Sequence, residues 1–269
     1  MRKNVYLMEN GTESLRLEIK TNTFIVEEQA KWAGIKPGMR IADIGCGPGV
    51  TTSILHKLAQ PNGETIGIDF SDNRLEYARN NYEKENLHFI NRDAREPLDD
   101  IGTFDFVWVR FLLEYYLNDS FEIVKNLYQI IKPGGILCLI DLDHNCLNHF
   151  GIPERLERTV TRIIEQLSLK ANFDPHVGRK LYSFLYDLKF KDIVVDVKAH
   201  HNIYGKLTQN DEFNFLRKIE IAPQKINYKF DEYVGGYDEF KDETKKWFKN
   251  YRRFTYTPII LCKGIKPKD

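Results

Sequence analysis

The chain has 269 residues, of which 42% are hydrophobic and 13% aromatic, so it can fill a large core and shows no composition typical of disorder. Lys plus Arg and Asp plus Glu both number 39, and the resulting zero formal charge excludes an overall field that would attract nucleic acid or an anionic membrane. We therefore expect a globular, enzyme-sized protein with no nucleic-acid or membrane partner. The sequence does not determine its oligomeric state.

The N-terminal part shows a helical pattern over residues 12–32 that ends at Gly34. We expect residues 1–35 to form a helical segment that closes over a binding site as a lid, with Tyr6 and Arg16 facing the ligand. No window approaches the roughly 20 apolar residues that cross a bilayer, and no signal-peptide run is present. The cysteines lack C-x-x-C spacing, which predicts buried thiols in a reducing compartment and a cytoplasmic location.

From residue 40 onward, short apolar runs alternate with helical patterns. This alternation predicts an α/β fold with parallel strands joined by right-handed helical crossovers. The run "KPGG" (132–135) is expected to end the last of these helices and to turn into the next strand. The expected strands are 40–44, 65–69, 87–91, 104–109 and 135–141, and the expected helices are 50–60, 73–82 and 120–131.

The second half of the chain carries two amphipathic patterns, 153–169 and 178–188, followed by strand-like runs at 191–199 and 257–265. The segment between these last two runs is longer than an ordinary connection and contains a helical pattern. We therefore predict a helical cap insertion. The expected division is a core at 36–200, the cap at 201–254, and the last core strand and tail at 255–269.

The stretch "RIADIGCGPGVTT" (40–52) reads as a strand, a glycine loop and a helix. In open α/β sheets ligands bind beyond the carboxyl ends of the strands, and glycine lets a ligand pack directly on the main chain. Dinucleotide enzymes favour G-x-G-x-x-G, but counting from Gly45 the third glycine position holds Val50. The pattern here is D-x-G-x-G-x-G, from Asp43 to Gly49. A tight turn without a ligand is the alternative.

Acidic residues follow the next two strands. Asp69 ends the second strand, where a carboxylate can accept both hydroxyls of a ribose; a solvated surface acid is the alternative. Asp93 and Ala94 follow the third strand in "RDA", and the alternative for Asp93 is a helix N-cap.

The features Asp43–Gly49, Asp69, "RDA", "FDFV" and "IKPGG" occur in the order typical of class I S-adenosylmethionine-dependent methyltransferases, and residues 38–142 resemble that family. The flanking stretches resemble a small-molecule branch of the methyltransferase-domain family. The resemblance implies a Rossmann-like sheet of seven mostly parallel strands with an antiparallel last strand. It also implies S-adenosyl-L-methionine as the cofactor and methyl transfer to an O, N or C atom of a small-molecule substrate.

The resemblance further implies roles for individual residues in cofactor binding. The loop with Gly45, Cys46 and Gly47 would pack against the methionine and sugar, and Asp43 would lie near the amino-acid end. Phe70 would flank the adenine, while Asp93 and the backbone N–H of Ala94 would bind its edge. Arg110 would meet the cofactor carboxylate or, alternatively, a surface acid.

Methyl transfer chiefly needs an aligned nucleophile and the exclusion of water, and alignment can supply roughly 7–11 kcal/mol. A general base would add about 10²–10⁴-fold for a hydroxyl or protonated amine. The candidates Asp141, Asp143, His144 and His149 follow the fifth strand, and we predict His144 as the catalytic base. A structural role for His144, or a divalent metal held by these four residues, is the alternative; we predict no metal.

Two other functions remain open. One is an NAD-dependent oxidoreductase, against which Val50 argues, and the other is a non-catalytic S-adenosylmethionine-binding module. Aromatic residues are candidates for the wall of a substrate pocket, with plain core as the alternative. They are Tyr6, Tyr115, Tyr116, Tyr237, Phe240, Trp247, Phe248 and Tyr251.

Overall fold

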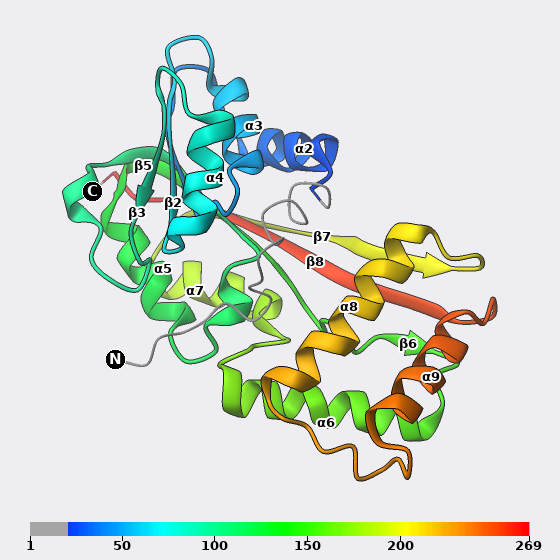
Figure 1. The fold of residues 1–269 in the computed structure, drawn as a ribbon. Coiled ribbons are helices and arrows are strands. Elements are labelled where there is room, and N and C mark those ends of the chain that lie inside the picture. The colour runs from blue at the N-terminus through cyan, green and yellow to red at the C-terminus, as the bar shows by residue number, and fades with distance from the viewer. Residues whose placement is uncertain (1–20, 269) are drawn as a thin grey trace.

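The computed structural model describes residues 21–268, which form a sheet covered by helices and a lobe of long helices beside it (Figure 1). The expectations for Tyr6, Arg16 and the rest of residues 1–20 lie outside the described residues. The strands are β1 (Arg40–Ile44), β2 (Glu64–Asp69), β3 (Leu87–Asn91), β4 (Phe104–Arg110), β5 (Ile131–Leu142), β6 (His149–Phe150), β7 (Lys191–Tyr204) and β8 (Phe254–Ile265). The helices are α2 (Thr23–Ala33), α3 (Val50–Ala59), α4 (Asp72–Tyr82), α5 (Ser120–Gln129), α6 (Glu154–Ala171), α7 (Leu181–Asp187), α8 (Gln209–Lys225) and α9 (Gly236–Phe248), with 3-10 turns η1 (Asp99–Ile101), η2 (Leu113–Tyr115) and η3 (Val177–Lys180).

The strands pair in the order β3-β2-β1-β4-β5-β8, with β6 and β7 both pairing with β8. Strands β1 to β5 are parallel, and β8 runs antiparallel to β5 and β7. The predicted α/β class and mostly parallel Rossmann-like sheet are therefore confirmed. The strand order reverses between β1 and β4, which places the crevice typical of such sheets at their carboxyl ends.

The predicted strand count differs slightly from the structure, because the described sheet contains eight strands rather than seven. The additional strand is β6, two residues that pair with the start of β8. The expectation for "KPGG" was wrong: α5 already ends at Gln129, and Ile131 pairs with Phe104 before the register moves to Ile136 opposite Phe106. Lys132–Gly135 therefore bulge out of β5 instead of linking helix and strand.

The sheet is covered on both faces, as its continuous apolar strands require. On one face, α5 and α7 pack on side chains that include Val107, Val109 and Leu139. On the other, α2 and α3 pack on Ile41, Trp108 and neighbouring residues. Helix α2 begins after Asn22, whose Oδ1 accepts the N–H of Ile25 at 3.2 Å, and ends at Gly34, as predicted.

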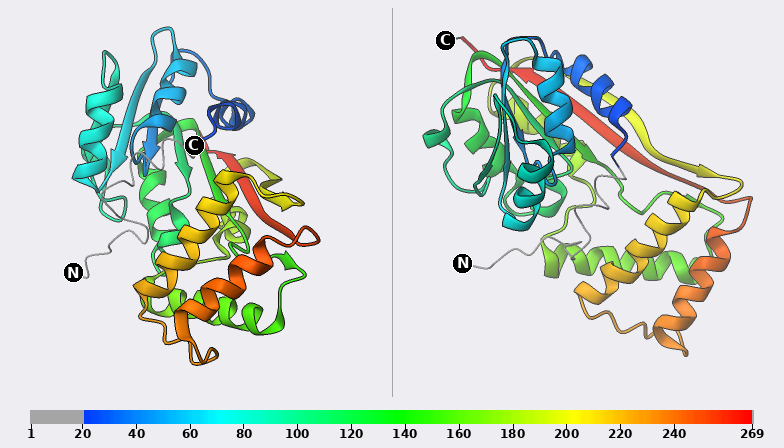
Figure 2. Two further views of the ribbon diagram at one scale, coloured as in Figure 1. Left: turned by 45° about the vertical axis from the view of Figure 1, so that its right-hand side comes forward. Right: turned by 45° about the horizontal axis from the view of Figure 1, so that its top comes forward.

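A second apolar cluster holds α6, α8 and α9 together in what we call the helical lobe (Figure 2). Its buried members include Ile164, Leu167, Phe240 and Phe248. Strands β7 and β8 are longer than predicted and run from the sheet to this lobe. Helices α8 and α9 lie within the predicted cap insertion and pack against α6, which precedes β7. The division of the chain into domains stays a prediction.

Candidate functional site

A cavity of about 240 Å³ lies between the carboxyl ends of the strands and the helical lobe. Its sheet side includes Gly45, Cys46, Gly47, Asp69 and Phe70. Its remaining wall comes from the segment after β3, from the ends of β4 and β5 and the segments that follow them, from β7 and from the helical lobe. The residues of that wall are Ala94, Arg110, Phe111, Leu112, Glu114, Tyr115, Tyr116, Leu142, Asn145, Cys146, Ile164, Leu167, Ala171, Phe173, His200, Lys218 and Ala222.

The glycine loop is fixed by backbone hydrogen bonds to β2. The N–H groups of Gly45 and Cys46 donate to the carbonyl of Ile68 at 2.8 and 3.0 Å, and the N–H of Gly47 donates to Oδ2 of Asp69 at 2.9 Å. Gly45 and Gly47 both have positive φ and both face the cavity. The two glycines thus contribute main-chain atoms to the cavity wall, and at Gly45 an added Cβ would lie 2.9 Å from the Leu112 side chain.

Gly49 serves packing instead, and its replacement by alanine is expected to destabilise the protein. Its φ is +89°, and an added Cβ would lie 2.9 Å from the Phe89 ring. Gly38 has a similar φ of +82° with nothing within 4 Å, so Gly38→Ala carries only the backbone strain of about 1–2 kcal/mol. Gly49→Ala should cost about 1–3 kcal/mol more through overpacking. Urea unfolding of both variants tests this, and equal losses would contradict it.

Asp69 is only 6% exposed and is held on both of its carboxylate oxygens. Besides the Gly47 bond, Oδ1 accepts the N–H of Ser71 and a guanidinium N–H of Arg74, both at 2.9 Å. Arg74 is itself buried, lies with its guanidinium 5.2 Å from the centre of the Phe70 ring, and lines the cavity. The sequence interpretation missed Arg74 because an arginine in an exposed helical pattern gives no sign of a buried partner.

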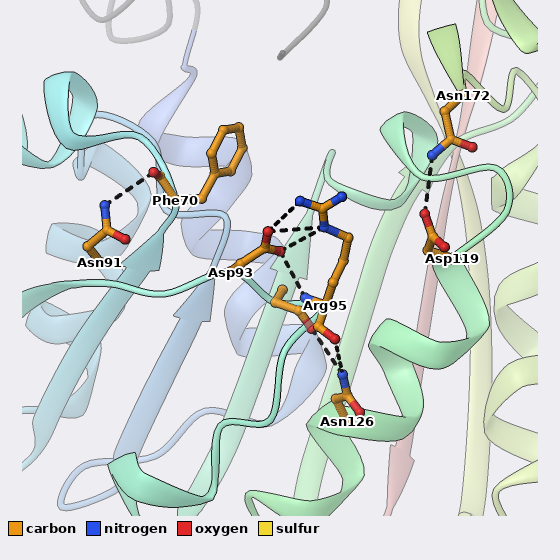
Figure 3. A network of polar contacts seen from close by, with 8 residues as sticks. Phe70, Asn91, Asp93, Arg95, Asp119, Asn126 and Asn172 are labelled. Carbon is orange, nitrogen blue, oxygen red and sulfur yellow. Dashed lines mark hydrogen bonds and ion pairs between the residues drawn. The ribbon is translucent and has the colours of Figure 1, made fainter. Parts of the chain in front are cut away.

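The carboxylate of Asp93 accepts hydrogen bonds from the side chain of Arg95 (Figure 3). Arg95 Nε lies 3.0 and 3.1 Å from the two carboxylate oxygens of Asp93, and Arg95 Nη2 lies 2.5 Å from Oδ2. Burial raises the pKa of Asp93, but the hydrogen bonds from Arg95 outweigh it and hold the pKa below its usual value. Ala94, not Asp93, is among the residues that line the cavity. Binding of the adenine edge by Asp93 stays a prediction.

Asp43 and Arg110 lie beneath the glycine loop. Asp43 Oδ2 accepts the hydroxyl of Thr52 at 2.7 Å, and burial raises the pKa of Asp43 to about 7 against the opposing effects of Thr52 and Arg110. Burial lowers the pKa of Arg110 to about 10, and its Nε donates to Gln29 at 3.1 Å. Within residues 21–268, Arg110 makes no ion pair shorter than 4.0 Å, and it lines the cavity.

The polar residues after β5 point in different directions. Asp141 accepts backbone N–H bonds from Leu113 and Leu142, and Asp143 pairs with Arg179 at 2.8 Å. The ring of His144 packs edge-on against His176 and does not line the cavity. Among the described residues, no group of three His, Cys, Asp or Glu side chains is arranged to hold a metal ion. The catalytic assignment of His144 receives no support from this geometry.

His149 is half-buried between β8 and the helical lobe, and its protonation is expected to destabilise the fold. Its ring nitrogens contact Thr255 Oγ1 and the Cys146 carbonyl, both at 3.0 Å, and burial lowers its pKa to about 4. The unfolded chain therefore binds a proton first, and stability that is complete above about pH 6.5 is lost as the pH falls toward 4.

The expected loss is about 2 kcal/mol by pH 5. Urea titrations of the wild type and of His149→Gln at pH 7 and pH 5 measure it. The free-energy gap between the two proteins should narrow at the lower pH; an unchanged gap would show that His149 does not titrate differently on unfolding.

The far half of the cavity contains a polar chain that the sequence interpretation missed. Glu114, 4% exposed, receives a hydrogen bond from Asn145 Nδ2 on Oε2 at 2.8 Å. Lys218 of α8 donates to Asn145 Oδ1 at 3.3 Å.

The aromatic residues predicted as candidates for the pocket wall lie in different places. Tyr115 and Tyr116 line the cavity, Phe240 and Trp247 lie in the lobe core, and Tyr251 is exposed.

The state of the cysteines and the absence of a membrane-spanning helix were also predicted from the sequence. Cys46, Cys138 and Cys262 are buried free thiols, and Cys146 is half-buried and free. In the part of the chain that the structure describes, no helix has the length and apolar character needed to cross a membrane.

This chain is similar to several known methyltransferases. A family model described as "Methyltransferase domain" matches residues 35–204, which is more than half of the chain. The demethylmenaquinone methyltransferase of Staphylococcus aureus is 37% identical over 109 residues, which cover 39% of this chain and 44% of that relative. The chain thus matches less than half the length of this curated relative.

Solved structures share the fold at low sequence identity. A crystal structure of a methyltransferase from Bacillus halodurans has a TM-score of 0.56 at 15% identity, covering 90% of this chain and 98% of the other. The phosphoethanolamine N-methyltransferase 2 of Haemonchus contortus, solved with phosphomonomethylethanolamine and S-adenosylhomocysteine, has a TM-score of 0.54 at 16% identity and covers 98% of this chain and 55% of the other.

Proposed function

The chain belongs to the methyltransferase-domain family, and from this premise we propose that it transfers the methyl group of S-adenosylmethionine to a small-molecule acceptor. The motif order that resembles class I enzymes is thereby explained. The observation that carries the proposal is a single cavity that joins the glycine loop and Asp69 to an apolar chamber under the helical lobe. One half has donors and acceptors suited to a nucleoside, and the other has room for a second molecule.

The residues of the sheet side fit the cofactor. Asp69 lines the cavity with a carboxylate that can accept from a ribose hydroxyl beside its hydrogen bonds with Gly47, Ser71 and Arg74. Phe70, Gly45 and Gly47 also line the cavity. Arg110 is a half-buried cation that lines the cavity and has no carboxylate within 4.0 Å among the described residues, which suits an α-carboxylate. When bound, the cofactor supplies a methyl group made electrophilic by its sulfonium.

The chain's own contribution is placement and the exclusion of water. Ile164 and Leu167 of α6 and Ala222 of α8 close the cavity opposite the glycine loop, so an acceptor is held between lobe and sheet. Such alignment can lower the barrier by roughly 7–11 kcal/mol without a dedicated catalytic residue. The roles of Asp43, Cys46, Asp93, Ala94 and His144, the small size of the acceptor, and a cytoplasmic location stay predictions.

Isothermal titration calorimetry with S-adenosylmethionine, S-adenosylhomocysteine and NAD tests the proposal. The first two should bind and NAD should not, because family membership and Val50 both disfavour a dinucleotide enzyme. Binding of NAD alone would overturn the proposal. Methyl turnover on a metabolite panel then separates the enzyme from a non-catalytic binding module.

Arg110→Met is expected to weaken S-adenosylmethionine binding about 10–30-fold, since a charge-assisted hydrogen bond to the carboxylate is lost. Decarboxylated S-adenosylmethionine provides the matched ligand: its affinity should already be low and should not change in the variant. A variant that loses equal affinity for both ligands would show that Arg110 acts on the fold of the site and not on the carboxylate.

A further inference from the structure

The acceptor half of the cavity has an apolar wall and a polar end. Its wall is formed by aliphatic and aromatic side chains of the helical lobe, among them Ile164, Leu167, Phe173 and Ala222. Its polar end is the chain Glu114–Asn145–Lys218 described above. A ligand in this chamber therefore buries an apolar body and presents a small polar group to these side chains.

The polar end carries both signs of charge. Glu114 comes from η2 beside the sheet, and Lys218 comes from α8 in the helical lobe. Asn145, 7% exposed, bridges them: its amide nitrogen donates to Glu114 and its amide oxygen accepts from Lys218. Among the described residues, Lys218 has no carboxylate within 4.0 Å, and its other polar contact is Cys146 Sγ at 3.5 Å.

This pairing favours one kind of ligand group. A carboxylate only accepts hydrogen bonds, and an ammonium only donates them. A hydroxyl does both, so it can donate to Glu114 while it accepts from Lys218. An anionic group would be repelled by Glu114, and a cationic group would be repelled by Lys218.

We propose that the acceptor is an uncharged compound with an apolar, ring-sized body and a hydroxyl group, which the carboxylate of Glu114 and the ammonium of Lys218 bind together. This inference rests on the proposed function, because it names the substrate class of the same site. Glu114 and Lys218 are then the specificity-determining residues, and Asn145 is a positioning residue that holds the two side chains in register.

The charges around Glu114 agree with this assignment. Burial raises the pKa of Asp141, and repulsion from Glu114 adds to it, while backbone N–H groups of Leu142, Glu114 and Leu113 oppose it. Of the two adjacent carboxyl groups, Asp141 is thus the one whose pKa is raised, and Glu114 is the one that faces the cavity. The nearby Asp174 is paired with Lys180 at 2.6 Å.

Three phenyl compounds of similar size test the inference. 4-Propylphenol has a hydroxyl donor, 4-propylanisole lacks the donor, and 4-propylbenzoate is an anion. Binding is measured by ligand-observed NMR and calorimetry, with and without saturating S-adenosylhomocysteine. The phenol should bind at least tenfold more tightly than the other two. No binding of the phenol, or tighter binding of the benzoate, would overturn the inference.

Variants test whether Glu114 and Lys218 cause the preference for a hydroxyl group. Glu114→Gln should weaken phenol binding about tenfold and strengthen benzoate binding about fivefold. Lys218→Met changes a half-buried residue, and it should weaken benzoate binding below that of the wild type. Glu122→Gln, an exposed acid on α5, is the matched control and should change nothing. A Glu114→Gln protein that folds and binds all three compounds like the wild type would overturn the inference, as would unchanged benzoate binding in Lys218→Met.

The titration with S-adenosylhomocysteine separates the two proposals. If S-adenosylhomocysteine binds and the phenol does not, the proposed function stands and the hydroxyl preference fails. If the phenol binds with the expected preference and S-adenosylhomocysteine does not, the chamber is assigned correctly and the proposed methyl transfer fails.

Discussion

Replacing Asp69 with asparagine is expected to lower the free energy of unfolding by about 3–5 kcal/mol, because it leaves the buried guanidinium of Arg74 without its carboxylate. The substitution also weakens the bond that Gly47 donates to the same side chain, which fixes the glycine loop. S-adenosylmethionine binding should fall by a further 1–3 kcal/mol, roughly the value of a hydrogen bond to a charged group. Urea unfolding and calorimetry measure the two effects separately.

The double variant Asp69→Asn/Arg74→Met is the control for this prediction. The second change removes the buried cation that has lost the Asp69 carboxylate, so the double variant should be clearly more stable than Asp69→Asn alone. Its cofactor affinity should remain low, since the ribose acceptor is still missing. If the two losses of stability simply add, the Asp69–Arg74 pair is not coupled and the explanation fails.

Replacing Arg253 with methionine is expected to cost about 3 kcal/mol or more and to loosen the helical lobe. Arg253 is 1% exposed and donates to the carbonyl oxygens of Phe248, Ile203 and Gly205, at 2.6, 3.0 and 3.3 Å. It thereby ties the end of α9 to the end of β7. Methionine fills similar space but provides no donor, so buried carbonyls lose their partners.

Hydrogen exchange locates the effect of this change. Amides of α8 and α9 should lose protection in Arg253→Met, whereas those of β1 to β5 should keep it, because the sheet has its own core. Arg252→Met is the matched control, since Arg252 is exposed and should be replaceable with little loss of stability. A uniform loss of protection across sheet and lobe would show that the two parts unfold together.

The sheet could be predicted well from the sequence because buried parallel strands leave continuous apolar runs between helical patterns. In the helical lobe, the helical patterns of α6 and α9 could also be predicted, but α8 could not. Helix α8 begins with polar residues and carries Pro223 inside its last turn, so its pattern resembles a loop. The bulge at Lys132–Gly135 was missed for a related reason: glycine and proline indicate a turn, and here they interrupt a strand that continues.

The site was predictable where local rules apply. Gly45, Gly47 and Asp69 sit at strand ends, and topology alone brings these ends to one edge of the sheet. His144 follows a strand end but does not line the cavity. The backbone turns sharply here, with a φ of +49° at His144 and +66° at Cys146. Asn145 and Cys146 therefore line the cavity, while the His144 ring packs against His176. Lys218 meets Asn145 across 73 residues, and no local pattern reports such a contact.

The two long strands β7 and β8 have a consequence for the evolution of this architecture. In the sequence, helices α8 and α9 lie between the end of β7 and the start of β8. The start of β7 and the end of β8 lie in the sheet, where β8 pairs with both β7 and β5. A replacement of the segment between the strands could therefore reshape the chamber under the lobe while the nucleoside half keeps its geometry. Recombination at these two strands would let one ancestral scaffold acquire new acceptors without rebuilding the part that handles the methyl donor.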